Sequence, residues 1–260
     1  MSGPLNLEAY IPSAADLLLG AAISGDVAEI SKLLAENPSL GASIPIAAAA
    51  RAGHCPAVML LLARPGALAD GSFALEQAAR NGHADCVKAL LDAAPASANI
   101  GTALADAASA GRSECVEILM PRASEDELAE ASRKAISQDH AQAAAMLLAG
   151  RGRLAIISAM DWASFNGSPK CLEALLPMCR QKSADPRWLR SAAYAGHVEC
   201  IRILLDAFPR LSTSRLRDLA SICRMGRLPA SAELPESRVD LHALEKLVPE
   251  HGAAQPKLRL

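Results

Sequence analysis

The stretch AARNGHADCVKALLDAAP at residues 78–95 decides the fold of this chain, because its pattern returns along the sequence. It recurs as AASAGRSECVEILMP at 107–121 and as AAYAGHVECIRILLDAFP at 192–209. Looser copies are AARAGHCPAVMLLLARP at 49–65, WASFNGSPKCLEALLP at 162–177 and AAISGDVAEISKLLAENP at 21–38. Self-similarity at a fixed period is the sequence signature of a repeat architecture.

A central glycine fixes the period of these units. The glycines are Gly25, Gly53, Gly82, Gly111, Gly167 and Gly196. Asp139 takes the equivalent place in the most degenerate unit, AISQDHAQAAAMLL at 135–148. Successive intervals are therefore 28 or 29 residues, and Gly226 lies 30 residues further on. We expect seven units from Asp16 to about Phe208, and an irregular eighth.

Each unit has the pattern of two short helices. In the third unit these are expected at 74–81 and 84–93, with Gly82 between them, where a left-handed backbone is cheapest for glycine. Pro95 then ends the second helix. The second helix carries one apolar stripe, formed by Cys86, Val87, Leu90 and Leu91. No stretch has the pattern of a strand, so the chain is predicted to be an all-α stack of helical hairpins.

The units resemble ankyrin repeats, whose signature is TPLHxAAxxGHxxxVxxLL. TALADAASAGRSECVEIL at 102–119 matches that signature nearly position by position, and the resemblance extends over about 16–226. It implies an ankyrin-type solenoid. The period, however, is four or five residues short of the usual 33, and the TPLH tetrad is lost in most units. The missing residues fall where the family has its β-turn finger, so we expect short or absent fingers and a binding surface made of helix faces.

Three regions are expected along the chain. Residues 1–12 form an irregular N-terminal segment, residues 13–227 the ankyrin-repeat solenoid, and residues 228–260 a C-terminal capping helix with a loose tail. Ser13 and Asp16 have the spacing of a capping box for the first helix, with Asp in place of the usual Glu. The capping helix is expected within SRVDLHALEKLV at 237–248.

Composition excludes several classes of protein. Apolar residues make up 51% and charged residues 21%, which excludes disorder throughout the chain. Acidic residues outnumber basic ones 28 to 26, so there is no global basic field for a nucleic acid. Charge or glycine breaks the apolar stretches before 18 residues, so no membrane span is expected.

Cysteine usage suggests where the protein works. There are seven cysteines and no CxxC pair, which favours the cytoplasm or another reducing compartment. The abundance of Ala and Arg is typical of a GC-rich bacterial genome. A host-directed effector and an intracellular adaptor both fit this composition, and the residues do not decide between them.

Two series of residues recur at one fixed position of the repeat. Each could be taken for a functional site, but a structural role is favoured for both. Neighbouring units place equivalent positions about 8–10 Å apart, too far for a disulfide or a shared zinc ion. The series Cys86, Cys115, Cys171 and Cys200 is therefore expected to be buried and apolar in role. The resemblance implies that His54, His83, His140 and His197 help to start the second helices. We predict no catalytic residue, no metal site and no cofactor.

Aromatic residues provide the candidate site. Only 3% of the chain is aromatic, yet four rings fall in one window. In ankyrin units the residues five, two and one before the central glycine face the concave side. The expected partner-binding residues are Trp162, Phe165, Asn166, Trp188 and Tyr194, with Lys134, Arg80 and Asn81 extending the groove toward the N-terminus. The alternative is that short fingers leave a gap, which Trp162 and Trp188 fill as core.

The expected function is that of a non-catalytic scaffold. The resemblance implies that the chain binds another protein, and the concave helical face is its expected binding surface. We also expect a monomer without a nucleic-acid or membrane partner. An enzyme is the alternative from another class, with its site near the C-terminal segment from Leu228, although that segment offers only His242 and His251. Nucleic-acid binding through scattered Arg is a weaker alternative, which the net charge of −2 opposes.

Overall fold

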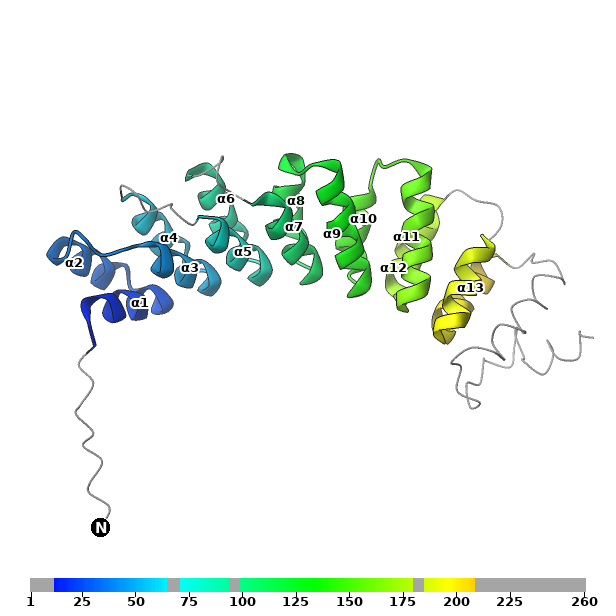
Figure 1. Cartoon of the computed structure of the whole chain (residues 1–260), viewed down its shortest axis with the longest axis horizontal. Coiled ribbons are helices and arrows are strands. Elements are labelled where there is room, and N and C mark those ends of the chain that lie inside the picture. The colour runs from blue at the N-terminus through cyan, green and yellow to red at the C-terminus, as the bar shows by residue number, and fades with distance from the viewer. Residues whose placement is uncertain (1–11, 65–70, 94–98, 180–184, 209–260) are drawn as a thin grey trace, which may run out of the picture. The chain divides into compact units, whose positions relative to one another are not determined.

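The structure is a computed structural model that describes residues 12–64, 71–93, 99–179 and 185–208. Over these ranges the regular structure consists of α-helices and one short 3-10 helix, with no strand. The helices form seven consecutive pairs, as the repeat pattern predicts (Figure 1). Contacts divide the chain into two compact units, residues 1–149 and 150–260.

The first unit contains five helix pairs. The pairs are α1 (Ala14–Ser24) with α2 (Val27–Glu36), α3 (Ser43–Ala52) with α4 (Cys55–Leu62), α5 (Gly71–Asn81) with α6 (Ala84–Ala93), α7 (Ile100–Ser109) with α8 (Ser113–Leu119), and α9 (Glu125–Ser137) with α10 (Ala141–Leu148). The 3-10 helix η1 (Met120–Arg122) follows α8. In the third repeat, the second helix α6 has the predicted boundaries, whereas the first helix α5 begins three residues earlier than predicted.

The second unit contains two described pairs. These are α11 (Arg153–Asn166) with α12 (Pro169–Cys179), and α13 (Pro186–Ala195) with α14 (Val198–Ala207). The predicted eighth repeat, the capping helix at 237–248, the tail and most of the N-terminal segment lie outside the described residues.

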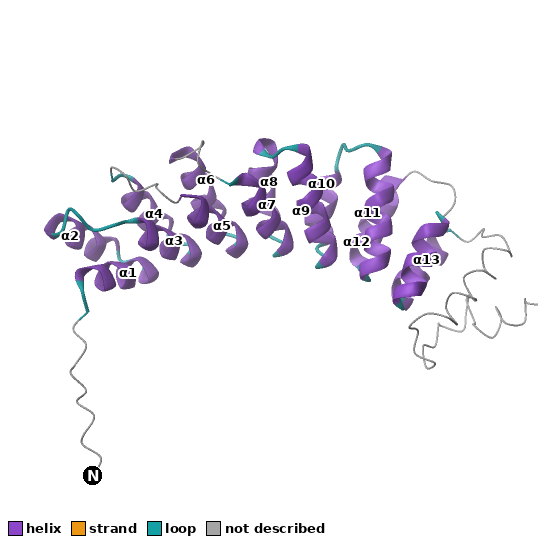
Figure 2. Cartoon of the chain, in the orientation of Figure 1, coloured by secondary structure: helices purple, strands orange, loops and turns teal. Residues whose placement is uncertain are grey.

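Each unit has two layers of helices. First helices contact first helices, from α1 through α3, α5 and α7 to α9, and α11 contacts α13. Second helices contact second helices in the same order, and each pair also packs against itself. The connections at 37–42 and 120–124 contain no strand (Figure 2). The predictions of an all-α repeat fold and of absent fingers at these two connections are therefore confirmed.

The turn inside every pair has a left-handed residue at the predicted position. All six predicted glycines have positive φ, from 68° to 87°. In the fifth pair the residue is Asp139, with φ of 55°, which is the one non-glycine residue with positive φ in the described ranges. The period inferred from the sequence is therefore the period of the fold, and it holds even in the repeat whose sequence departs most from the pattern.

Small side chains form the interface between the two layers. The fourth and third residues before each turn residue are alanine in most pairs, and the alanines at these positions are buried. Alanine allows two helices to approach closely while it keeps a high helix propensity. The second helices supply the larger apolar groups, such as Cys86, Val87, Leu90 and Leu91 of α6, all buried as predicted.

The histidines after the turns connect neighbouring repeats. His54 stands at the N-cap of α4, but its side chain makes no capping hydrogen bond. Its Nε2 lies 3.0 Å from the carbonyl oxygen of Ile23 in the preceding pair. The same 3.0 Å contact recurs from His83 to Arg51 O and from His197 to Phe165 O. His54 and His197 thus stand at the N-cap position of their second helices, as expected, but their side chains bond to the previous turn and do not cap the helix.

The first helix begins with the predicted capping box. The backbone N–H of Ser13 donates to Oδ2 of Asp16 at 2.9 Å, and the N–H of Asp16 donates to the Ser13 hydroxyl at 3.2 Å. Two of the N–H donors that would otherwise be unpaired at the start of α1 are thus satisfied.

Candidate binding surface

The first helices present one repeated stripe of side chains. Residues nine, five and two positions before each turn residue follow i, i+4, i+7 spacing and therefore share a helix face. We call this stripe the first-helix surface. In α11 it consists of Ser158, Trp162 and Phe165, and in α13 of Arg187, Ser191 and Tyr194.

Three aromatic rings are exposed on this surface in the second unit. Tyr194 is 67% exposed, Phe165 49% and Trp162 38%. The rings of Trp162 and Phe165 contact each other at a centroid distance of 6.3 Å, tilted by 32°. Tyr194 belongs to α13, which packs against α11. We call Trp162, Phe165 and Tyr194 the aromatic cluster.

Polar groups bridge the helices beside the cluster. The hydroxyl of Ser191 on α13 donates to Oδ1 of Asp161 on α11 at 2.8 Å. Arg187 forms two bonds to the carboxylate of Asp185, at 3.2 and 3.0 Å. Leu154, two turns before Trp162 on α11, is exposed and was not predicted as a surface residue. The rings thus stand on a surface with fixed polar contacts at its edge.

Trp188 is not part of this surface. Its side chain is 0% exposed, its Nε1 donates to the carbonyl oxygen of Ile157 at 3.2 Å, and its ring packs on Phe208 at 6.0 Å. It stands eight residues before Gly196, the phase at which α5, α7 and α9 bury alanine. The expectation that Trp188 contributes to the exposed site is therefore wrong, and the alternative of a core role holds for this residue.

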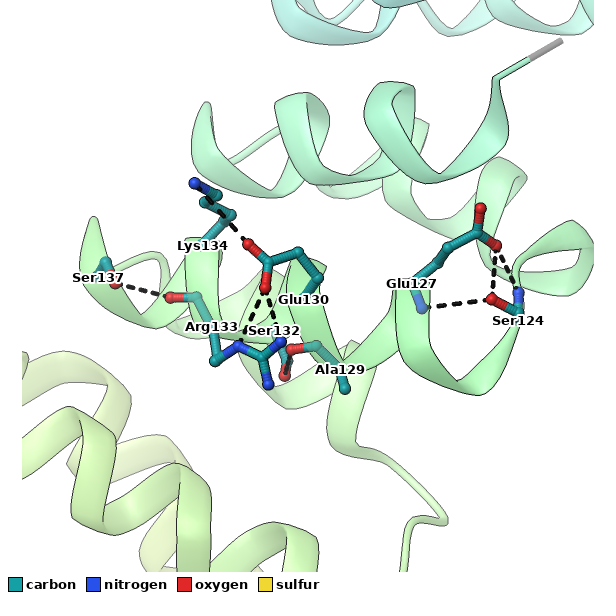
Figure 3. Close-up of polar contacts among 8 residues, drawn as sticks. All are labelled: Ser124, Glu127, Ala129, Glu130, Ser132, Arg133, Lys134 and Ser137. Carbon is teal, nitrogen blue, oxygen red and sulfur yellow. Dashed lines mark hydrogen bonds and ion pairs between the residues drawn. The ribbon is translucent and has the colours of Figure 1, made fainter.

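The predicted polar residues of the first unit already have partners. Nη2 of Arg80 lies 2.7 Å from Oδ2 of Asp106, an ion pair between α5 and α7. Lys134 Nζ lies 3.8 Å from the carboxylate of Glu130, which also binds Arg133 (Figure 3).

Two predicted asparagines cap their own helices. Nδ2 of Asn81 donates to the carbonyl oxygen of Gln77 at 2.8 Å, and Nδ2 of Asn166 donates to that of Trp162 at 2.8 Å. Both bonds run to the carbonyl of the residue four positions earlier in the same helix. These amides therefore have a local structural role.

A hollow on the first-helix surface of the first unit was missed at the sequence level. It lies between α3 and α5 and has a volume of about 590 Å³. Its apolar walls include Ile44, 70% exposed, and Phe73, 55% exposed. Both stand nine residues before their glycine, one turn before the position that was considered. Extending the i, i+4 periodicity by one turn would have identified them.

Known proteins match this arrangement. The sequence profile described as "Ankyrin repeats (3 copies)" matches residues 17–101, 46–131 and 75–158. The chain belongs to the ankyrin-repeat family. Among solved structures, the ankyrin repeat domain of human ASB11 is 19% identical with a TM-score of 0.51, covering 89% of this chain and 97% of that one. The ankyrin repeat domain of Bcl-3, described as a unique member of the IkappaB family, is 20% identical with a TM-score of 0.43, covering 80% of this chain and 97% of that one.

These likenesses at low identity concern the fold. No sequence among the curated proteins matches the chain significantly. Ankyrin repeats in general mediate interactions between proteins.

The four cysteines that recur at one position of the repeat are core residues. Cys86, Cys115, Cys171 and Cys200 are buried, as predicted. Burial raises the pKa of the Cys86 thiol to about 12 and that of Cys115 to about 11, which suppresses the reactive thiolate. Across the part of the chain that the structure describes, no three His, Cys, Asp or Glu side chains are grouped to hold a metal ion. No helix there is long and apolar enough to span a membrane.

One carboxyl of the ankyrin stack has a shifted pKa beside the first-helix surface. Glu76 on α5 lies near the Arg80–Asp106 pair. Partial burial and the negative charge of Asp106 raise its pKa, and the charge of Arg80 opposes that rise. An acidic side chain at this place therefore weakens the local structure at neutral pH.

Proposed function

We propose that this ankyrin-repeat protein is a non-catalytic scaffold that binds a partner protein, with the aromatic cluster as the anchor of the interface. The observation that carries the proposal is the exposure of Trp162, Phe165 and Tyr194 on adjacent helices. The chain has few aromatic residues, and the core of these two helices is formed by other side chains, among them Met160, Ala163 and Leu189. Packing therefore does not account for them, whereas binding does.

The chemistry of the cluster is that of an interface hot spot. Trp and Tyr are enriched at such spots because their rings bury a large area at low cost in side-chain entropy. Arg190 is exposed on α13, four residues before Tyr194, and makes no ion pair with another described residue. A partner that covers the rings and offers a carboxylate to Arg190 would satisfy both groups.

The other predicted residues have smaller roles in this proposal. Arg80 and Lys134 can contact a partner only in competition with Asp106 and Glu130. Exposed ion pairs of this kind contribute little energy and mainly affect association rate and selectivity. Asn81 and Asn166 would have to leave the carbonyl groups that they cap.

The proposal extends to the setting in which the protein works. We place it in a reducing compartment, since five of the six described cysteines are buried in the core. It is proposed to act as a monomer without a cofactor, either as an intracellular adaptor or as an effector delivered into a host cell. A catalytic site in the segment from Leu228 would lie outside the described residues, and the net charge of −2 disfavours a nucleic acid.

The test compares partner capture by three forms of the full chain. The forms are the wild type, the double variant Phe165→Ala with Tyr194→Ala, and the control Met59→Ala. Met59 is similarly exposed, but it lies on α4, a second helix in the first unit. Captured proteins are quantified by mass spectrometry, and each candidate is then purified and titrated against all three forms.

The expected result is one protein that binds the wild type and Met59→Ala alike and binds the double variant at least about tenfold more weakly. Circular dichroism should show the same helix content and thermal transition for all three forms. Equal binding by the double variant and the wild type would place the interface elsewhere. An unfolded double variant would show that the rings are core.

A further inference from the structure

The hollow between α3 and α5 combines apolar walls with a cation. Ile44, Ala47 and Ala48 of α3 face Phe73 of α5 across it. Arg51 and Gln77 also line it, with Ser43 and Ser72, and none of the lining side chains in the described ranges is acidic. The volume of about 590 Å³ lies within the range of pockets that hold small ligands or a few peptide side chains.

The contact between the next two first helices, α5 and α7, contains a carboxylate that has no equivalent among the residues lining the hollow. Arg80 of α5 stands two residues before Gly82. It pairs at 2.7 Å with Asp106 of α7, which stands five residues before Gly111. Arg51 stands at the position of Arg80, but the position of Asp106 is occupied by the neutral Gln77. No ion pair of Arg51 is found among the described residues. The same register thus gives a closed ion pair between α5 and α7, and a guanidinium without a carboxylate between α3 and α5.

Other charges near Arg51 do not fill this role. The carboxyl of Glu76 on α5 responds to Asp106 and Arg80, which places it beside the α7 side of its helix. The Arg51 backbone carbonyl is occupied by His83, which fixes the end of α3 without engaging the guanidinium. The site therefore has an exposed guanidinium, without an ion pair to any described residue, next to exposed apolar groups.

We propose that this hollow is a second docking site, for a short acidic segment of a partner protein. An apolar side chain of that segment packs between Ile44 and Phe73, and a neighbouring carboxylate binds Arg51. The site goes beyond the aromatic cluster, since it belongs to the first unit and uses none of the cluster's residues. Charge complementarity selects the occupant, because a carboxylate supplies at Arg51 what Asp106 supplies at Arg80.

The binding of a minimal probe tests the site without a known partner. The probe is the blocked dipeptide N-acetyl-leucyl-glutamate amide, and its matched control is the corresponding glutamine dipeptide. Each is titrated into the full chain, and the Arg51 side-chain N–H and the Ile44 methyl groups are followed by NMR. Saturable shifts at both residues are expected for the glutamate probe, with affinity about tenfold above that of the glutamine probe.

Three variants separate the carboxylate contact from general charge. Arg51→Gln should reduce the affinity for the glutamate probe to that for the glutamine probe. Gln77→Asp should do the same while Arg51 remains, because the new carboxylate takes the place that Asp106 has beside Arg80. Arg133→Gln, which removes the same charge from α9, should leave binding unchanged.

Other occupants give distinct results that would overturn the proposal. Equal affinity for the two dipeptides would show that no carboxylate is recognised. Equal shifts with inorganic phosphate alone would identify a simple anion site, and shifts that depend on protein concentration alone would identify a second copy of the chain. The Phe165→Ala, Tyr194→Ala double variant should bind the probe like the wild type, so failure of one site is distinguishable from failure of the other.

Discussion

A methyl group on Gly53 would lie only 2.5 Å from Cε1 of His83, because the imidazole of His83 covers the turn of the preceding repeat. The relationship recurs between Gly25 and His54, between Gly111 and His140, and between Gly167 and His197. At Gly82 the side chain of Arg112 takes the place of histidine, and its Nε donates to the carbonyl oxygen of Arg80 at 3.3 Å. Glycine is thus needed for its backbone conformation and for the space that the next repeat occupies.

Gly53→Ala should destabilise the protein by about 2 kcal/mol, since alanine is strained at φ of 82° and its methyl would displace His83. The control is Gly20→Ala within α1, where no atom lies within 4 Å of the added methyl. That change should stabilise the helix by about 0.5–1 kcal/mol. Urea unfolding monitored by circular dichroism measures both. Similar effects of the two substitutions would contradict the proposed contact.

Asp139 should show the cost of a side chain in a left-handed turn. Asp139→Gly and Asp139→Ala both remove the carboxylate, so the difference between them isolates the backbone. The glycine variant should be more stable by about 1 kcal/mol at φ near 55°. Thermal and urea unfolding of the two variants side by side provide the measurement, and equal stability would mean that the turn relaxes.

The turn residues also show why the fold was predictable from the sequence. A left-handed residue every 28 or 29 positions and a repeated apolar stripe fix the helix pairs, even where Asp139 replaces glycine. Trp188 was wrongly expected on the exposed surface because its large ring suggested an interface residue, whereas its position relative to Gly196 indicates the core. Eight residues before the glycine, other repeats bury alanine, and only the packing of α13 on α11 and Phe208 shows that a tryptophan fits there.

The hollow beside Phe73 depends on information that a single repeat does not contain. Its walls come from two helices, and its charge is open only because Gln77 replaces an acidic residue at that register. Comparing equivalent positions between repeats reveals the missing carboxylate, but the space itself requires coordinates. The surface positions of Ile44 and Phe73, by contrast, follow from extending the i, i+4 spacing of each first helix by one turn.

Glu76→Gln should stabilise the protein at neutral pH. Because burial and Asp106 raise the pKa of Glu76 in the folded state, the favourable contribution of its protonated form is complete below the ordinary value of 4.5. That contribution is lost as the pH rises through the raised value. The gain from Gln should therefore be largest at pH 7 and shrink toward pH 4, as measured by urea unfolding at each pH. The same change at exposed Glu117 controls for net charge, and an identical pH profile there would argue against the effect.

Ser124→Ala should raise the pKa of Glu127 and destabilise α9 by about 1 kcal/mol. In the wild type the backbone N–H and the hydroxyl of Ser124 donate to the Glu127 carboxylate at 2.7 and 2.8 Å, and these bonds lower its pKa (Figure 3). The variant keeps the backbone bond, so the pKa rises only part of the way to 4.5.

The pH dependence of this capping box has the opposite sign to that of Glu76. A lowered folded pKa contributes stability above the ordinary value, and that stability is lost as the pH falls through the folded value. The cost of Ser124→Ala should therefore be largest near neutral pH and smaller in acid. NMR titration of the Glu127 carboxyl carbon measures the pKa directly, and an unchanged value would exclude a role for the hydroxyl.

Substitutions at Trp188, Phe165 and Trp162 should distinguish a core ring from a surface ring by stability and by fluorescence. Trp188→Ala removes a fully buried ring and its hydrogen bond to the Ile157 carbonyl, so it should cost about 3–5 kcal/mol. Phe165→Ala removes a half-exposed ring and should cost less than about 1 kcal/mol. Because the chain has two tryptophans, Trp162→Phe leaves Trp188 as the single emitter. Its fluorescence should be blue-shifted and protected from acrylamide, whereas Trp188→Phe should leave the red-shifted, readily quenched emission of Trp162. If quenching is instead stronger in Trp162→Phe, then Trp188 is exposed in solution and belongs to the binding surface after all.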